Sequence, residues 1–178
     1  MLLTIGGTLV FMLLFSIVPL VTLNTQSYHQ IAVQAANAFG IQENEFVIEF
    51  KDDLRNKNGR QVQGLYIGNR IINDTRVHHI QVRKQHFRVL TISTIFHEFA
   101  HAAQFHHNLC TGDLNKEQHA ELLAFTAMQQ NGFWWESLHM LTLHTLNAKP
   151  VEYRIPSELW AMTFGNNVND ISLNFNAS

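Results

Sequence analysis

The stretch "TISTIFHEFAHAAQF", residues 91–105, places two histidines and a glutamate among small and apolar residues. Residues 87–107 contain neither glycine nor proline, which predicts one long helix. On a helix, residues four apart share a face, so His97 and His101 point in the same direction. Glu98 lies about 100° around the helix axis from His97. Leaving these three polar groups unpaired among apolar neighbours would cost several kcal/mol.

His97, Glu98 and His101 form the H-E-x-x-H arrangement, which suits a zinc ion. Two neutral imidazoles can hold the ion, and zinc lowers the pKa of its bound water toward about 7. A neighbouring carboxylate can accept the proton as that water attacks a carbonyl group. The pattern therefore predicts Zn²⁺ as cofactor, His97 and His101 as ligands and Glu98 as the catalytic base. Two partly buried histidines beside a surface glutamate are the alternative interpretation.

A second acidic motif follows at "EQHAE", residues 117–121, in a segment with helical spacing. Glu117 and Glu121 are four apart and share a face, and the neighbouring Ala120, Leu123 and Ala124 indicate that this face packs inward. One glutamate can be the third zinc ligand while the other accepts the Nδ1–H of a zinc-binding histidine. The spacing alone leaves open which glutamate has which role.

Together, "HEFAH" and "EQHAE" resemble the motifs of small gluzincin metallopeptidases, with Glu121 where that group usually has aspartate. The layout of residues 27–130 is similar to that of the ImmA/IrrE-like peptidases. The resemblance implies that Glu117 is the metal ligand and Glu121 its support, although a ligand at Glu121 would match the spacing of thermolysin-like enzymes. It also implies a peptide substrate lying along a sheet edge, at the strand 62–68 or 77–83.

The remaining pattern predicts an α+β fold with a zincin-like core. Residues 27–39 have helical spacing, followed by a small antiparallel sheet of strands at 45–50, 62–68 and 77–83, with "GNRIIND" connecting the last two. Asn58–Gly59 marks a turn. After the helix at 87–107, further helices are expected at 114–132, 133–146 and 155–164.

The N-terminal stretch, residues 2–23, is 22 residues long and carries no charge. That length can span the hydrocarbon core of a bilayer as a helix. No Lys or Arg precedes it and no Ala-x-Ala pattern follows closely, so a transmembrane anchor is favoured over a cleaved signal peptide. We therefore expect a single-pass anchor at 1–24 and a metallopeptidase domain at 25–178.

Net charge and cysteine content bear on which classes of function the sequence supports. The net charge of −2 gives no reason to expect nucleic-acid binding, and the single cysteine, Cys110, excludes an intramolecular disulfide. Tyr66, His119 and Tyr153 are candidate oxyanion donors, although each residue type is more often structural. The sequence predicts a membrane-tethered zinc endopeptidase acting on a protein or peptide. Its rivals are an inactive zinc-binding, membrane-anchored interaction module and an interaction protein without metal.

Overall fold

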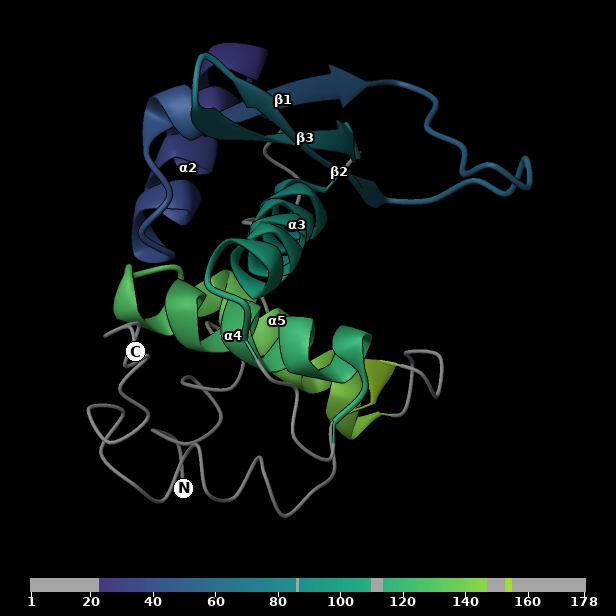
Figure 1. Ribbon diagram of the computed structural model, residues 1–178. Coiled ribbons are helices and arrows are strands. Elements are labelled where there is room, and N and C mark those ends of the chain that lie inside the picture. Colours follow the sequence, from purple (N-terminus) through teal and green to yellow (C-terminus); the bar gives the residue numbers. More distant parts are fainter. Residues whose placement is uncertain (1–22, 86, 110–113, 147–152, 155–178) are drawn as a thin grey trace, which may run out of the picture.

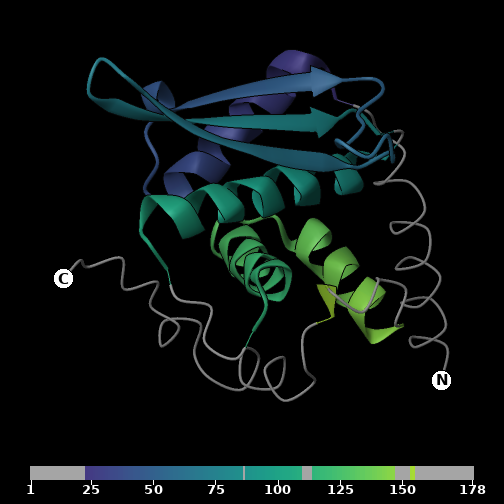
Figure 2. The same ribbon diagram turned by 45° about the vertical axis from the view of Figure 1, so that its right-hand side comes forward.

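The computed structural model describes residues 23–85, 87–109, 114–146 and 153–154. These residues form an α+β fold, as predicted, in the order α2 (Thr25–Ala38), β1 (Phe46–Lys51), β2 (Gly64–Ile72), β3 (Thr75–Arg83), α3 (Arg88–His106), α4 (Lys116–Gln130) and α5 (Trp134–Thr145). A short 3₁₀ turn, Glu43–Glu45, precedes β1. The sheet forms one layer, α2 and α3 lie against it, and α4 and α5 cover α3 from the other side (Figures 1 and 2).

The sheet has the strand order β1-β3-β2 and is mixed, so the prediction of an antiparallel sheet is wrong. β2 and β3 pair antiparallel, whereas β1 pairs parallel with β3 in the register Phe46↔His78. The Asn58–Gly59 turn belongs to an excursion between β1 and β2, closed by an isolated bridge between Arg55 and Gln61. β1 therefore does not form a hairpin with β2 and instead pairs with the far side of β3.

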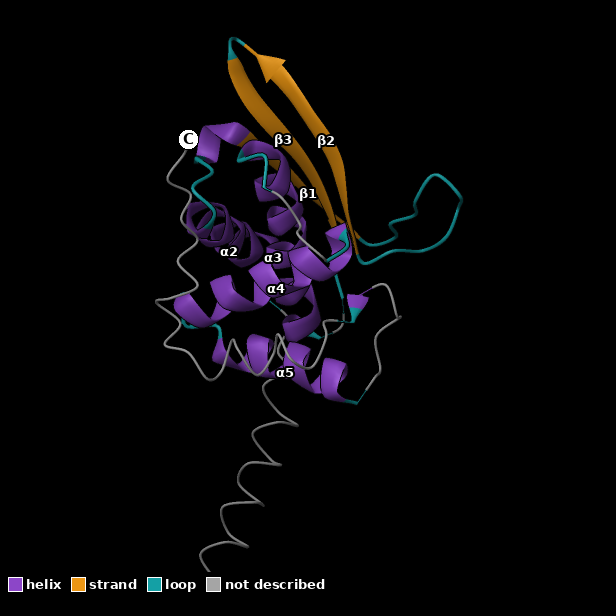
Figure 3. Ribbon diagram, turned by 60° about the horizontal axis from the view of Figure 1, so that its bottom comes forward, coloured by secondary structure: helices purple, strands orange, loops and turns teal. Residues whose placement is uncertain are grey.

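The connection expected at "GNRIIND" is mostly strand. β2 continues through Ile72, and the turn to β3 is only Asn73–Asp74, whose φ angles of 49° and 62° fit a tight two-residue hairpin. A register irregularity between Tyr66 and Gly68 marks a bulge in β2. The β2–β3 hairpin extends past the helices, and the β1–β2 excursion projects separately (Figure 3).

The core lies between the sheet and α3 and continues between α3 and α4. In β3 the alternate residues His78, Ile80 and Val82 are buried and face inward. α3 carries buried residues around most of its circumference because it contacts α2, α4, α5 and the sheet. This central position fixes its polar side chains between two layers.

Three predictions concern segments outside this description: the anchor at 1–24, Cys110 and the helix at 155–164. Among the residues that the structure describes, no helix is both long and apolar enough to cross a membrane.

Candidate metal centre

α3 and α4 bring three side chains to one point. The Nε2 atoms of His97 and His101 lie 3.1 Å apart, and Glu117 Oε2 lies 3.2 Å from each of them. A tetrahedral ion with bonds of about 2.0–2.1 Å would separate its ligand atoms by about 3.3 Å. The triangle of donor atoms therefore fits a zinc ion, and its two imidazoles and one carboxylate are a common zinc donor set.

Glu121 lies behind His97 rather than beside Glu117. Its Oε1 is 3.1 Å from His97 Nδ1, and its Oε2 is 3.1 Å from His144 Nε2 on α5. Glu121 is almost fully buried. Of the two arrangements that the sequence left open, the structure brings Glu117 to the ligand atoms and Glu121 to the opposite nitrogen of His97.

His101 has an equivalent support in Gln104, which the sequence analysis did not single out. Gln104 Oε1 lies 2.9 Å from His101 Nδ1, and its Nε2 donates to the Lys116 carbonyl at 2.9 Å. The same amide lies 3.1 Å from His119 Nδ1. If His101 donates from Nδ1 to Gln104, its Nε2 lone pair points at the Glu117 carboxylate, as metal binding requires. His97 Nδ1 lies 3.1 Å from Glu121 Oε1 but without hydrogen-bond geometry, so the two atoms meet as a close polar contact.

Glu117 reaches the site because α4 begins just before it. Asn115 caps the helix, accepting from Gln118 N at 2.9 Å, and Gln118 Oε1 accepts from Asn115 N at 3.1 Å. This reciprocal cap fixes the first turn of α4, so Glu117 approaches the α3 histidines from a defined direction.

The carboxylates dominate the electrostatics of the centre. Burial alone would lower the pKa of His97, but its contacts with Glu117 and Glu121 raise it to about 10. Burial raises the pKa of Glu117, yet its contacts with His101 and His97 lower it overall, well below its ordinary value. Without a metal the cluster therefore favours binding a proton, which indicates a site that attracts cations.

Glu98 lies beside this centre, 6% exposed, on the side facing β2. The backbone N–H of Tyr66 donates to its carboxylate, while burial raises its pKa above the ordinary value. β2 comes this close because residue 64 is glycine. A Cβ at Gly64 would collide with the Glu98 carboxylate and lie 2.6 Å from Thr94 Cγ2. Sequence patterns gave no sign of this contact.

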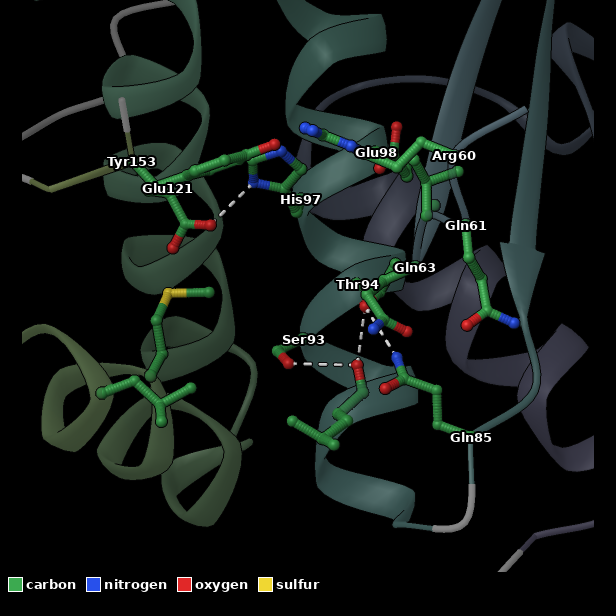
Figure 4. A pocket seen from close by; sticks show the side chains of 15 residues that line it. Arg60, Gln61, Gln63, Gln85, Ser93, Thr94, His97, Glu98, Glu121 and Tyr153 are labelled. Atoms are coloured by element: carbon green, nitrogen blue, oxygen red, sulfur yellow. Dashed lines mark hydrogen bonds and ion pairs between the residues drawn. The ribbon is translucent and has the colours of Figure 1, made fainter. Parts of the chain in front are cut away.

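A pocket of about 510 Å³ lies along the N-terminal half of α3 and reaches the candidate metal centre at His97 and Glu98 (Figure 4). Leu90, Thr94, His97 and Glu98 share the α3 face that lines it. Residues 60–64 and Gln85 form the wall on the sheet side, and Met140 and Leu143 of α5 add apolar surface.

Of the candidate oxyanion donors, Tyr153 lines the pocket, with its ring centroid 5.9 Å from that of His97. Tyr66 instead directs its hydroxyl to His78 Nδ1 at 3.0 Å, and His119 contacts Gln104. The structure therefore leaves Tyr153 as the one of the three at the pocket.

No protein-family model, curated protein or solved structure is significantly similar to this chain.

Proposed function

We propose that this chain is a zinc-dependent metallopeptidase with a zincin-like core, and that it hydrolyses peptide bonds within a protein substrate. The observation that carries the proposal is the convergence of His97 Nε2, His101 Nε2 and Glu117 Oε2 within 3.1–3.2 Å, with Glu98 buried beside them. The hydrogen bond between His101 Nδ1 and Gln104, the Glu121 carboxylate 3.1 Å from His97 Nδ1 and an adjoining pocket also support hydrolysis at a metal centre.

In this proposal His97, His101 and Glu117 hold Zn²⁺, and Glu121 and Gln104 orient the imidazoles. The ion supplies Lewis acidity, which lowers the pKa of a water molecule and polarises the substrate carbonyl. Glu98 accepts the proton of the attacking water and delivers it to the leaving amine. Its raised pKa suits a carboxylate that must both take and release a proton.

β2 is the strand along which the peptide would bind. The sequence offered the strands at 62–68 and 77–83, but the second is β3, which lies between β1 and β2 and has no open edge. β2 pairs only with β3 among the described strands, and Gly64 at its start borders the pocket. An extended peptide beside Gly64 would gain main-chain hydrogen bonds and pass Glu98.

We also propose that residues 1–24 tether the protein to a membrane, because residues 2–23 form an uncharged segment of spanning length. Extraction of cell membranes at alkaline pH tests this part separately. The full chain should stay with the membrane, whereas a chain starting at residue 25 should be released. Release of both would remove the tether from the proposal without affecting the metal centre.

The decisive experiment compares the purified full chain with Glu98→Gln in metal analysis and in cleavage of a mixed peptide library. Both proteins should carry about one zinc per chain, and the substitution should lower the cleavage rate about 10²–10⁴-fold. Equal activity of the two proteins would contradict the role of Glu98. Zinc without cleavage in wild type would favour the inactive binding module, and a folded, metal-replete protein without zinc would favour the interaction protein.

A further inference from the structure

Among the described residues that line the pocket, Arg60 is the one permanent cation. Arg60 belongs to the β1–β2 excursion and lines the same pocket as His97 and Glu98. Figure 4 shows its side chain reaching from the excursion toward these two residues. The other residues of this wall, Gln61, Gln63 and Gln85 among them, are uncharged. Any anionic group that enters from this side therefore meets Arg60.

The backbone of the excursion holds Arg60 in place. Asn56 N donates to the Arg60 carbonyl at 2.9 Å, and Asn56 Oδ1 accepts from Arg60 N at 3.1 Å. The next residue, Gln61, donates from its side chain to Asp53 at 3.2 Å and pairs with Arg55 in the isolated bridge. Because the main chain is fixed on both sides, placing the guanidinium against a ligand costs less conformational entropy.

The neighbouring acids are already engaged with other bases. Asp53 pairs with Arg55 at 3.0 Å, and Asp52 pairs with Lys84 at 2.8 Å. Within the described part of the chain, no carboxylate pairs with the Arg60 guanidinium. A guanidinium presents a planar fork of donors that matches a carboxylate, so a carboxylate group brought by a ligand would complement Arg60.

The carboxylates of the candidate metal centre explain why a cation at the pocket wall would help a substrate bind. Glu98, Glu117 and Glu121 bring three carboxylates, which exceed the two positive charges of a zinc ion. An acidic substrate would be repelled by this excess at close range. Arg60 offsets the excess at the pocket wall and would attract and orient such a substrate.

Building on the function proposed above, we infer that Arg60 is a specificity-determining residue that binds a carboxylate of the peptide substrate. The preferred substrate carries an acidic group close to the cleaved bond. This group is either an aspartate or glutamate side chain or the C-terminal carboxylate of a short peptide. The chemistry recognised is the same in both cases, and the peptides in the test separate them.

The test measures binding, so that it does not depend on turnover. Short peptides capped with a zinc-chelating hydroxamate are titrated into the zinc-loaded full chain and followed by calorimetry. The peptides carry glutamate or glutamine next to the cap, each with a free or an amidated C-terminus. Wild type should bind peptides with the recognised carboxylate about tenfold more tightly than their neutral counterparts. Whichever carboxylate gives this preference identifies the source.

Arg60→Gln should abolish the preference while leaving zinc content and the affinity for the doubly neutral peptide unchanged. Arg60→Lys should retain part of it, because the charge remains without the planar fork. Lys57→Gln removes the same charge from the same excursion at a residue that does not line the pocket, so its preference should match wild type.

Equal binding of all peptides by wild type, or a preference that survives in Arg60→Gln, would overturn the role of Arg60 alone. Failure of every hydroxamate peptide to bind the zinc-loaded protein would instead contradict the proposed peptidase site, and the inference would fall with it.

Discussion

Two histidine pairs in this protein have the same nitrogen–nitrogen separation and opposite electrostatics. In the first pair the Nε2 atoms of His97 and His101 lie 3.1 Å apart, and in the second pair His78 Nε2 lies 3.1 Å from His106 Nδ1. Carboxylates raise the pKa of His97 to about 10. Burial and the neighbouring His106 lower the pKa of His78 to about 4. The distance between two imidazoles therefore does not define a metal site.

The partners of each pair explain the difference. Glu117 and Glu121 contact the first pair, whereas the second pair contacts the Tyr66 hydroxyl and no carboxylate within hydrogen-bonding distance in the described residues. Carboxylates beside an imidazole favour positive charge there, whether a proton or a metal ion that displaces the proton, and a pair without them gains no such stabilisation. The first pair therefore has the surroundings of a cation site, and the second is a buried hydrogen-bonded unit whose surroundings favour neutral imidazoles.

Removing the Glu117 carboxylate should bring the first pair closer to the second in its electrostatics, although Glu121 remains beside His97. Glu117→Gln keeps the size of the side chain but removes its charge, so zinc affinity should fall about 100-fold or more. Competition with a fluorescent chelator measures the affinity. His106→Gln is the matched control in the second pair and should keep wild-type affinity and stoichiometry. Loss of zinc from the control alone would reverse the assignment of the two pairs.

A weaker effect is expected from the carboxylate that supports His97 from behind. Glu121→Gln can still accept a hydrogen bond from Nδ1 but no longer stabilises charge on the imidazole, so zinc affinity should fall about 10–100-fold. The same competition assay measures it. A larger loss than that of Glu117→Gln would make Glu121 the ligand and return the assignment to the thermolysin-like spacing.

The first pair could be predicted from the sequence because its geometry is local. Four residues on a helix fix the separation of His97 and His101, and the uncharged residues around them indicate burial. The choice between Glu117 and Glu121 could not be made from spacing, because both lie on the same face of α4. It depends on the direction in which α4 crosses α3, which tertiary packing decides.

The second pair and the edge strand depend on contacts between distant residues. His78 and His106 lie on different elements, 28 positions apart, and meet only because β3 occupies the centre of the sheet. That position follows from parallel pairing with β1, whereas the Asn58–Gly59 turn signal favours an antiparallel neighbour. Gln104 and His144 contact side chains on α4 for the same reason, and no local pattern marks them.

β2 contacts Glu98, which lies next to the first pair, and His78 of the second pair. Its first residue, Gly64, can be altered without changing the candidate metal ligands or the second pair. In Gly64→Ala the new methyl group would collide with Glu98 and Thr94, so β2 or Glu98 must move. We expect peptide cleavage to fall about tenfold or more, zinc content to stay unchanged and unfolding free energy to drop by about 1–3 kcal/mol. Cleavage assays, metal analysis and urea unfolding measure the three quantities.

Adding Thr94→Ser to Gly64→Ala distinguishes two effects of the new methyl group, its collision with Thr94 and its displacement of Glu98. Thr94→Ser removes Cγ2 but keeps the Oγ1 that accepts from Gln85 at 3.3 Å. Added to Gly64→Ala, it should recover part of the lost stability and little of the lost activity. Full recovery of activity would mean that Glu98 is not displaced, and wild-type activity of Gly64→Ala itself would show that β2 adapts freely.

The smallest expected effect is a pH dependence of folding stability that comes from His78 in the second histidine pair. His78 is fully buried, and its folded pKa of about 4 lies below its ordinary value of 6.5. As the pH falls below about 6.5, the unfolded chain takes up a proton at His78 that the folded chain does not, so stability declines. The decline from this residue ends near pH 4, where the folded state also binds the proton. Its size should be about 1–3 kcal/mol.

Urea unfolding of wild type and His78→Gln at pH 7, 5.5 and 4.5, both with zinc removed, measures this contribution as a difference. Groups that do not contact His78 contribute equally to both proteins and cancel, so the difference reports His78 together with its partner His106. Wild type should exceed the variant most at pH 7, and the gap should narrow as the pH falls. Parallel stability curves would mean that burial does not keep His78 neutral, and the contrast between the two histidine pairs would then rest on the carboxylates of the first pair alone.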